Sequence, residues 1–544
     1  MSRKTTDRRG FLKYAGATAI AASAAGCIGG GDGEGTDEPT DGGGDGNGDG
    51  GGTETDTDGG DDSMGTFEVS ITQGNMPSGL DPHDHRETPT DVVMLHAYEG
   101  LLTRDASGKM VEGLATGYSR VDGEPAVEFE LRSDVTFHNG DDFTAEDAAY
   151  SINRIVDEEV GFASPQSDQL AGVTGAEAGD GTVRVNTDGV NPIVFSEFAT
   201  YCDIVQKSWI EARSKQEIAQ DMNGTGPFKL EDYTEDQSVV LVRNEDYWND
   251  PAAVSKLTFT AASESSTRVN QLVAGETDIV VNVPPQQVSK VNNNDGTSIK
   301  ASPSTRIIYN ALRYDVEPFS SKKFRQALNY AIDLESIVSN VLGGFGAPTG
   351  QPTLENFVGH NPDVEPYPYD PDQAETLVDE SGHAGVEIEL HTPAGRYLKD
   401  LEIAQAVAGY IDELPNVSAT VRQRDFGSLV DELLTGNIED KPKWYLIGWG
   451  EATFEGALVM RALLATNGAL TTWSNDEFDS LLDKAANQTG DARVQTLQEA
   501  NALAHEEAPW IFLNRQFSVY GVADRVDWQP RSDERIDAYA MSPK

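Results

Sequence analysis

Residues 137–147 read FHNGDDFTAED, and this stretch predicts a tight turn followed directly by a helix. Asn139-Gly140 suits a turn that needs a positive φ, because glycine adopts that backbone conformation without steric cost. Thr144 and Asp147 have the spacing of a capping box, in which the hydroxyl accepts from a first-turn amide. The helix is therefore expected to start just after Thr144 and to run on through Ala148 and Ile152.

Strand and helix patterns continue from this stretch toward both ends of the chain. Five segments read as strands, by alternation or as short apolar runs: 127–131, 239–242, 278–281, 386–390 and 444–449. The apolar residues from 324 to 341 fall on one helical face, and Asp370-Pro371 opens another helix that Gly382 ends. Mixed elements predict α/β or α+β lobes, and 544 residues are too many for one core, so two or three lobes are expected.

The charge of the chain excludes one class of partner. Asp and Glu number 91 against 40 Lys and Arg, a formal net charge of −51. A nucleic-acid binder needs cationic surface to neutralise phosphates, so no nucleic-acid partner is expected. Acids spread this evenly suit a solvated surface in very high salt, which suggests an extreme halophile of haloarchaeal type.

The N-terminus reads as an export address. Arg8-Arg9 and the residues after them match the twin-arginine pattern, and a short apolar run follows up to Ala25. Ala24-Ala25-Gly26-Cys27 resembles a lipobox, so residues 1–27 are interpreted as a twin-arginine lipoprotein signal with Cys27 as the lipidation site. An ordinary cleaved signal is the alternative.

Residues 28–65 are almost all Gly, Asp, Thr and Glu. Such a segment cannot bury enough apolar surface to order itself, and its like charges repel. It is expected to be a disordered acidic tether between the membrane and the globular residues 66–544, which we call the body.

Motifs for catalysis and for metal binding are weak throughout. The chain has no G-x-S-x-G, no H-E-x-x-H and no Walker A pattern, so no enzymatic activity and no cofactor are expected. His83 and His85 could hold a metal ion, but no third ligand is near them in sequence, and a solvated loop without metal is expected. Cys202 has no disulfide partner within the body and is expected to be a small buried apolar residue.

A series of short blocks, in order along the body, resembles the peptide- and nickel-type solute-binding proteins of ABC importers, known as family 5. The blocks are Leu80-Asp81-Pro82, Tyr98-Glu99-Gly100-Leu101, residues 137–147, Gly224-Thr225-Gly226-Pro227-Phe228-Lys229 with Arg243-Asn244 and Tyr247-Trp248, Asn310 with Pro318-Phe319, Arg325-Gln326-Ala327 and Ala331-Ile332-Asp333, Tyr369-Asp370-Pro371, and Ala508-Pro509. Each block alone is weak, and their order makes the resemblance specific.

The resemblance implies an α/β fold of the periplasmic-binding-protein type (cluster C): a two-lobed clam shell of three domains with a hinge and an interlobe cleft. The expected divisions are lobe 1 at 66–105, 222–302 and 516–544, an inserted domain at 106–221, and lobe 2 at 303–515.

The resemblance also implies positions that contact the solute in the cleft: Arg86, Thr88, Tyr309, Phe426 and Trp449. Peptide binders of the family carry an Asp three residues after the Trp, where this chain has Ala452; Glu451 and Glu455 lie close enough in sequence to substitute. The solute class therefore stays open between peptide, oligosaccharide, metal chelate and another small solute.

The function that the resemblance implies is the substrate-binding component of an ABC importer. It would capture a solute, most simply a peptide, at the outer face of the cytoplasmic membrane and deliver it to permease and ATPase subunits. Two alternatives remain: an anchored extracellular hydrolase, and a solute sensor with the same fold.

Overall fold

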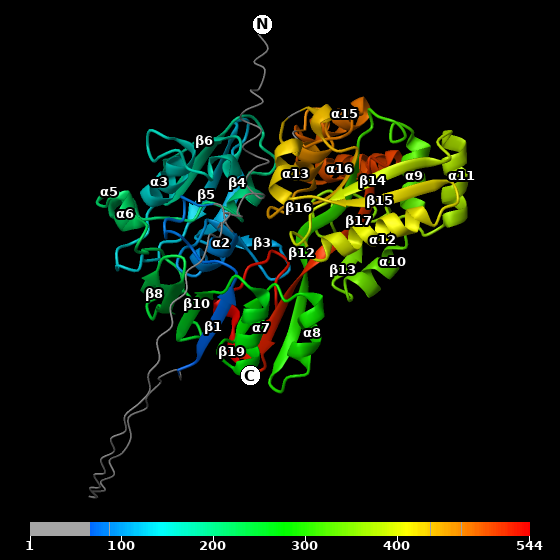
Figure 1. Cartoon of the computed structure of the whole chain (residues 1–544). Coiled ribbons are helices and arrows are strands. Elements are labelled where there is room, and N and C mark those ends of the chain that lie inside the picture. The colour runs from blue at the N-terminus through cyan, green and yellow to red at the C-terminus, as the bar shows by residue number, and fades with distance from the viewer. Residues whose placement is uncertain (1–65, 86–87, 436, 469) are drawn as a thin grey trace, which may run out of the picture.

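The structure is a computed structural model that describes residues 66–85, 88–435, 437–468 and 470–544. One mixed sheet of eleven strands extends through the body (Figure 1). Its order is β15 (Val417–Gln423), β14 (Val386–Thr392), β16 (Trp444–Gly450), β12 (Thr297–Leu312), β17 (Trp510–Ala523), β11 (Ile279–Val281), β1 (Glu68–Gln73), β10 (Lys256–Ala261), β9 (Ser238–Arg243) and β8 (Phe228–Thr234), with β13 (Gly346–Pro348) paired to β17.

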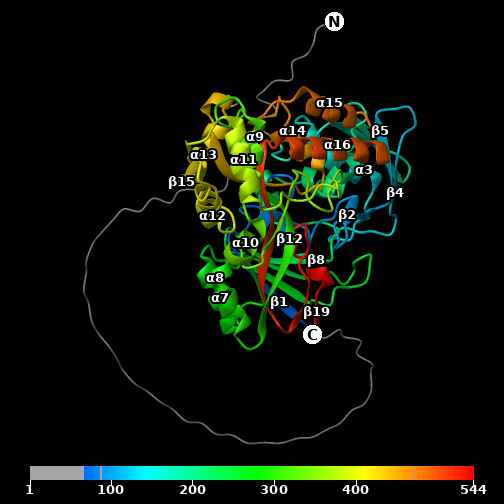
Figure 2. The same cartoon turned by 90° about the vertical axis from the view of Figure 1, so that its right-hand side faces the viewer.

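The long antiparallel strands β12 and β17 connect the two ends of this sheet (Figure 2). At one end β17 pairs with β11, and at the other end β12 pairs with β16. Their register shifts between Pro303 and Ile307, which marks a bulge between the two ends. Arg515 fills this irregularity and donates a 2.6 Å hydrogen bond from Nε to the carbonyl of Ser304. The pairing of the strands is thus interrupted between the end beside β11 and the end beside β16.

A separate four-stranded sheet belongs to the segment that Figure 1 draws in cyan, and two short strand pairs complete the β structure. The sheet has the order β4 (Ala115–Arg120), β5 (Ala126–Leu131), β7 (Thr182–Thr187) and β6 (Val173–Ala178). The pairs are β2 (Leu102–Arg104) with β3 (Met110–Glu112), and β18 (Val526–Asp527) with β19 (Ser542–Pro543).

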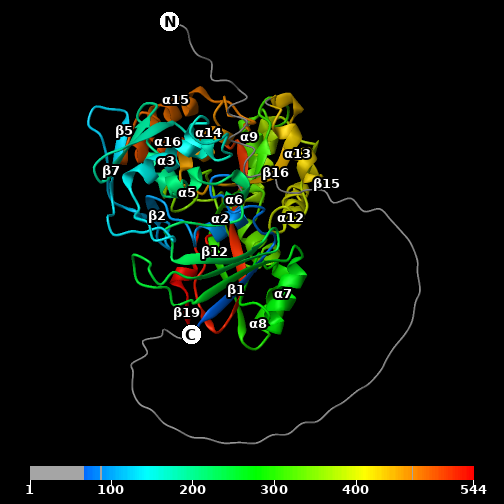
Figure 3. The same ribbon diagram turned by 90° about the vertical axis from the view of Figure 1, so that its left-hand side faces the viewer.

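The helices fall into three groups, which Figure 3 shows from the side of α3. Near the four-stranded sheet and the start of the body lie α2 (Thr88–Met94), α3 (Ala145–Val156), α4 (Val194–Phe198), α5 (Lys207–Glu211) and α6 (Lys215–Ile218). Beside β1 and β11 lie α7 (Ser265–Ala274) and α8 (Pro285–Asn292). The third group is α9 (Lys322–Tyr330), α10 (Leu334–Ser336), α11 (Pro371–Ser381), α12 (Asp400–Asp412), α13 (Phe426–Leu433), α14 (Gly456–Leu463), α15 (Asp476–Ala485) and α16 (Gly490–Glu507).

The local structure predicted around residues 137–147 is confirmed. Gly140 has a φ of 90°, and α3 begins after Thr144 with both hydrogen bonds of the capping box. The helix opened by Pro371 is also confirmed, with Asp370 as its N-cap and Gly382 in the left-handed conformation at its end. All five predicted strands are present.

The prediction of one continuous helical face from 324 to 341 is wrong. Helix α9 ends at Tyr330, and a new turn starts after Asp333, whose side chain accepts a hydrogen bond from the backbone amide of Ser336. Residues Ile337–Val341 then form a π-helical turn. The apolar periodicity of 3.6 survives the break, so it could not reveal the internal cap.

The apolar cores follow the chain in blocks. One core contains buried residues between Ile307 and Leu513, and a second contains residues between Leu101 and Ile204. The core around β1, β9 and β10 includes the C-terminal residues Trp528–Met541 as well as Val205 and Trp209. Residues 205–218 thus pack with this core although they fall inside the expected inserted domain; the domain boundaries themselves stay a prediction.

The predicted signal, tether and lipidation site at Cys27 lie outside the described residues. Among the residues that the structure describes, no helix has both the length and the apolar character needed to cross a membrane. Cys202 is buried in the core between Leu101 and Ile204, as predicted.

Candidate functional site

A cavity of about 500 Å³ lies where the two ends of the long sheet and the segment that carries the four-stranded sheet meet. Seven parts of the chain supply its wall: α2 with Leu95, Arg104 of β2, residues 169–203 around α4, Thr305 and Arg306 of β12, the end of β16 with the loop after it, α14, and the C-terminal loop 533–535. Residues more than 300 positions apart in sequence therefore face one another across it. This position, between the two cores, is that of the expected interlobe cleft.

Three of the residues implied by the sequence line this cavity: Thr88, Trp449 and Glu451. Arg86 lies outside the described residues. Tyr309, Phe426 and Glu455 are described but are absent from the cavity wall.

Tyr309 is a core residue instead. Its side chain is 3% exposed and stacks on Trp510, with 3.8 Å between the ring centroids. Residues 307–312 of β12 are buried on both faces of the strand, so alternation along the sequence could not show which side faces the cleft. Phe426 opens α13 and packs edge-on against Tyr397, with ring centroids 6.1 Å apart.

Trp449 lies near the end of β16, where the strand leaves the core and reaches the cavity. Residues Trp444–Ile447 are buried, whereas Trp449 is partly exposed and lines the wall. The strand pairs with β12, which places Ile307 opposite Trp449. An indole at this point presents apolar surface to anything that enters the cavity.

Glu451 and Glu455 have different environments. Glu451 lines the cavity, and its Oε1 accepts from the backbone N and Oγ1 of Thr453 at 3.2 and 2.8 Å. Glu455 forms an ion pair of 2.8 Å with Arg493 and accepts from Ser196 Oγ at 3.0 Å. Burial raises the pKa of both carboxyl groups. Since Glu455 already has a buried cationic partner, Glu451 is the acid of the two that remains available to a solute.

A third buried acid, Glu197 of α4, faces these two glutamates. Burial raises the pKa of its carboxyl to about 8, an effect opposed by its hydrogen bond from Asn191 and reinforced by the negative charges of Glu455 and Glu451. Glu197 lines the cavity, and a pKa of about 8 favours the protonated form of its carboxyl at neutral pH. Sequence reasoning missed it because nothing in its local pattern distinguishes it from the many other acids of the chain.

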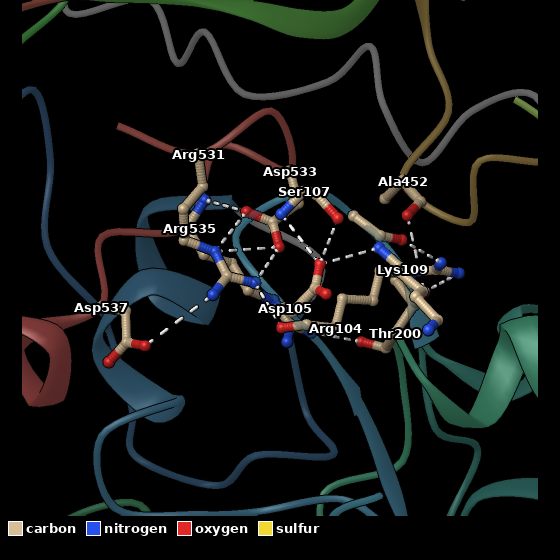
Figure 4. Close-up of polar contacts among 11 residues, drawn as sticks. Arg104, Asp105, Ser107, Lys109, Thr200, Ala452, Arg531, Asp533, Arg535 and Asp537 are labelled. Atoms are coloured by element: carbon tan, nitrogen blue, oxygen red, sulfur yellow. Dashed lines mark hydrogen bonds and ion pairs between the residues drawn. The ribbon is translucent and has the colours of Figure 1, made fainter. Parts of the chain in front are cut away.

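Arg104 connects three parts of the wall (Figure 4). It leaves β2, donates to the carbonyl oxygens of Gly108 and Thr453 at 2.9 and 2.8 Å, and lies beside Thr200. Its guanidinium also lies over the ring of Phe454, 4.9 Å from the centroid. Sequence reasoning missed this residue too, because its partners are distant in the chain.

The C-terminal loop closes another side of the site, also visible in Figure 4. Arg531 forms an ion pair with Asp533 and donates from Nη2 to the carbonyl of Arg104 at 2.7 Å. Arg535 donates to the carbonyl of Thr200 at 3.0 Å. These contacts hold the loop against Arg104 of the β2–β3 hairpin and against Thr200, which follows α4.

The two histidines considered as metal ligands are buried, so the prediction of a solvated loop is wrong. His83 is fully buried and donates from Nε2 to the carbonyl of Asp203 at 2.7 Å; burial lowers its pKa to about 3. His85 lies 3.7 Å from Asp91. Within the described ranges, no group of three or more His, Cys, Asp or Glu side chains is arranged to hold a metal ion.

Comparison with known proteins identifies the family. Residues 109–470 match the family model described as bacterial extracellular solute-binding proteins, family 5 Middle. The chain belongs to this family. The resemblance drawn from the sequence blocks is therefore confirmed, and so is the role that it implies: a solute-binding protein of the kind that serves ABC importers. This is a family of binding proteins.

Relatives and solved structures agree over most of the body. The glutathione-binding protein GsiB of Salmonella typhimurium is 26% identical over 473 residues, which cover 82% of this chain and 89% of that protein. The structure of HbpA2 from Haemophilus parasuis matches with a TM-score of 0.79 at 20% identity, covering 88% of this chain and 100% of that one.

The periplasmic binding protein DppA from Helicobacter pylori, in complex with the peptide STSA, matches with a TM-score of 0.69 at 19% identity over 88% of this chain and 98% of its own. At this identity the likeness shows the fold alone. The predicted α/β clam shell of periplasmic-binding-protein type is confirmed.

Proposed function

We propose that this member of family 5 captures a peptide or a similar small solute outside the membrane and delivers it to the permease and ATPase subunits of an ABC importer. The observation that carries the proposal is the interlobe cavity with Trp449 and Glu451 in its wall. Its volume of about 500 Å³ lies within the range of about 300–1,000 Å³ that is usual for small-molecule sites.

The charges in the wall suit a solute with a positive group. Ala452 occupies the position at which peptide binders of the family carry an Asp, and Glu451 directly precedes it. The Glu451 carboxylate faces a site where water is largely excluded, so an ammonium group bound there would be held strongly. A peptide amino terminus has this chemistry.

The N-terminal address supports a location at the outer face of the cytoplasmic membrane. A lipid on Cys27 would anchor the body through the acidic tether, and the twin-arginine pattern fits export in the folded state. Export is tested by replacing Arg8 and Arg9 with Lys: the variant is expected to stay in the cytoplasm, and its normal export would point to the general secretory route.

The solute is tested with the purified protein. Material released from it by denaturation is analysed by mass spectrometry, and a tripeptide pool is titrated calorimetrically against the ligand-free protein. Binding without turnover supports capture; hydrolysis of the pool would favour the anchored hydrolase. A solute that binds while no permease or ATPase subunit associates with the protein would favour the sensor.

A further inference from the structure

One arginine of the cavity wall stands apart from the others. Arg306, on β12, is partly buried, yet its guanidinium makes no hydrogen bond or ion pair with any residue that the structure describes. Among the described arginines of the cavity wall, it is the one whose guanidinium has no hydrogen-bond acceptor in the protein.

The other three arginines of the wall are engaged by the protein itself. Arg104 donates to the carbonyl of Thr453 at 2.8 Å, Arg535 donates to that of Thr200 at 3.0 Å, and Arg461 donates to that of Leu482 at 2.5 Å. Their donors serve the fold. The five N–H donors of the Arg306 guanidinium have no acceptor among the described residues. They are therefore left for a bound group.

Two neighbours hold Arg306 in place. Its guanidinium lies against the backbone of Gly450, where a β-carbon would come within 3.0 Å of Nη2 and 3.2 Å of Cζ. The ring of Tyr397 lies 5.9 Å from Cζ, and its hydroxyl donates to the carbonyl of Gly448 at 3.1 Å, which fixes the ring. A β-carbon on Gly448 would in turn approach this ring to 2.9 Å. The glycines on both sides of Trp449 thus make room for Tyr397 and for the cation.

None of the described acids in the wall forms an ion pair with this cation. Asp533 forms its ion pair with Arg531, Glu534 accepts from Ser518 Oγ at 3.0 Å, and Glu451 accepts from Thr453 Oγ1 at 2.8 Å. Arg396, the other cation beside Tyr397, lies near enough to Arg306 for their charges to repel. Arg306 and Arg396 place two cations beside Tyr397, an arrangement that suits a bound anion.

We propose that Arg306 is a specificity-determining residue that binds a carboxylate of the solute. The planar fork of a guanidinium matches the two oxygens of a carboxylate in a way that an ammonium does not. This inference rests on the proposed function and deepens it: the captured solute carries a free carboxylate, as a peptide with an unmodified C-terminus does.

The test compares two pools of tripeptides, one with free C-terminal carboxylates and one with C-terminal amides, titrated against wild type, Arg306→Gln and Arg422→Gln. The last is a control of equal charge change on β15, where Arg422 is 58% exposed. Wild type and the control are expected to bind the free acids at least about tenfold more tightly than the amides. Arg306→Gln is expected to bind both pools equally, at the level of the amides.

A preference for free acids that persists in Arg306→Gln would overturn the inference, as would the absence of a preference in wild type. Gly450→Ala gives a second measurement without removing the charge: it crowds the guanidinium and should reduce the preference. If neither peptide pool binds wild type, the peptide assignment fails, and a mixture of small carboxylic acids without peptide bonds is titrated. If wild type binds these acids and Arg306→Gln does not, the inference stands. If wild type does not bind them, or if Arg306→Gln binds them as well as wild type does, the inference is overturned.

Discussion

Arg104 donates a hydrogen bond of 2.8 Å to the carbonyl oxygen of Thr453, a residue 349 positions later in the chain. The donor, Arg104, belongs to the β2–β3 hairpin beside the four-stranded sheet. The acceptor, Thr453, belongs to the loop that follows β16. A second contact crosses the same gap, from Ser196 Oγ to Glu455 Oε1 at 3.0 Å. The walls of the cavity are therefore bonded to each other directly, in the arrangement expected of a closed clam shell.

Arg104→Ala is expected to favour the open form and to weaken solute binding. The change removes the bond to Thr453 and the contact with Phe454, which join the lobes only when they are closed. A loss of about 1–3 kcal/mol in the closed state corresponds to roughly a 5- to 150-fold loss of affinity. Small-angle scattering and titration would measure both effects. Arg120→Ala is the control, because within the described residues Arg120 donates only to Val190 and Asn191, in its own segment. Equal loss in both variants would contradict the prediction.

Trp449→Ala is expected to weaken binding at least about tenfold while the fold survives. An aromatic contact contributes about 0.5–1.5 kcal/mol beyond the area it buries, and truncation often costs more. Phe426→Ala makes a matched comparison, because Phe426 is also partly buried but does not line the cavity. Calorimetric titration with the solute recovered from purification measures the affinity of each variant, and only Trp449→Ala is expected to lose affinity. Normal binding by Trp449→Ala would remove the residue from the site.

The sequence could predict what a few adjacent residues encode. The turn at Gly140, the cap at Thr144 and the start of α11 each depend on contacts within four residues, and all are found in the structure. The pairing of Glu455 could not be predicted, because Arg493 and Ser196 are 38 and 259 residues away in sequence. Arg306 was missed for the same reason: its isolation becomes visible only when the surrounding acids can be seen to bind elsewhere.

Low salt is expected to destabilise the body. Residues 66–544 carry 35 Lys and Arg against 78 Asp and Glu, and this excess of negative charge repels itself. The Debye length falls from about 10 Å at 0.1 M salt to about 3 Å at 1 M, so the repulsion is screened over that range. The melting temperature should rise accordingly. A melting temperature independent of salt would contradict this account of the charge.

Cys27→Ser is expected to release the protein from the membrane. Without a lipid-bearing Cys27, the acidic tether has nothing to hold it at an anionic surface, which repels it. Fractionation of cells into membrane and soluble material, with washing in high salt, measures the outcome. Cys202→Ser serves as the control, because Cys202 is buried in the body; it should leave the protein in the membrane fraction. Retention of Cys27→Ser there would show that the anchor lies elsewhere.

Glu197→Gln is expected to protect the protein at alkaline pH. Burial raises the pKa of Glu197 from an ordinary value of 4.5 to about 8, so the folded state holds this proton more tightly than the unfolded chain does. Its contribution to stability is therefore complete below about pH 4.5, declines through the window between the two pKa values, and is gone above about pH 8. The glutamine is neutral throughout and keeps an acceptor oxygen for Asn191.

The melting temperature of Glu197→Gln should match that of wild type near pH 4 and exceed it by a few degrees near pH 8.5, since about 1 kcal/mol shifts a large domain by about 2–4 °C. Glu387→Gln, a change at an exposed position of β14, should follow the wild-type curve, and a Glu197→Gln curve that also runs parallel to wild type would contradict the assignment.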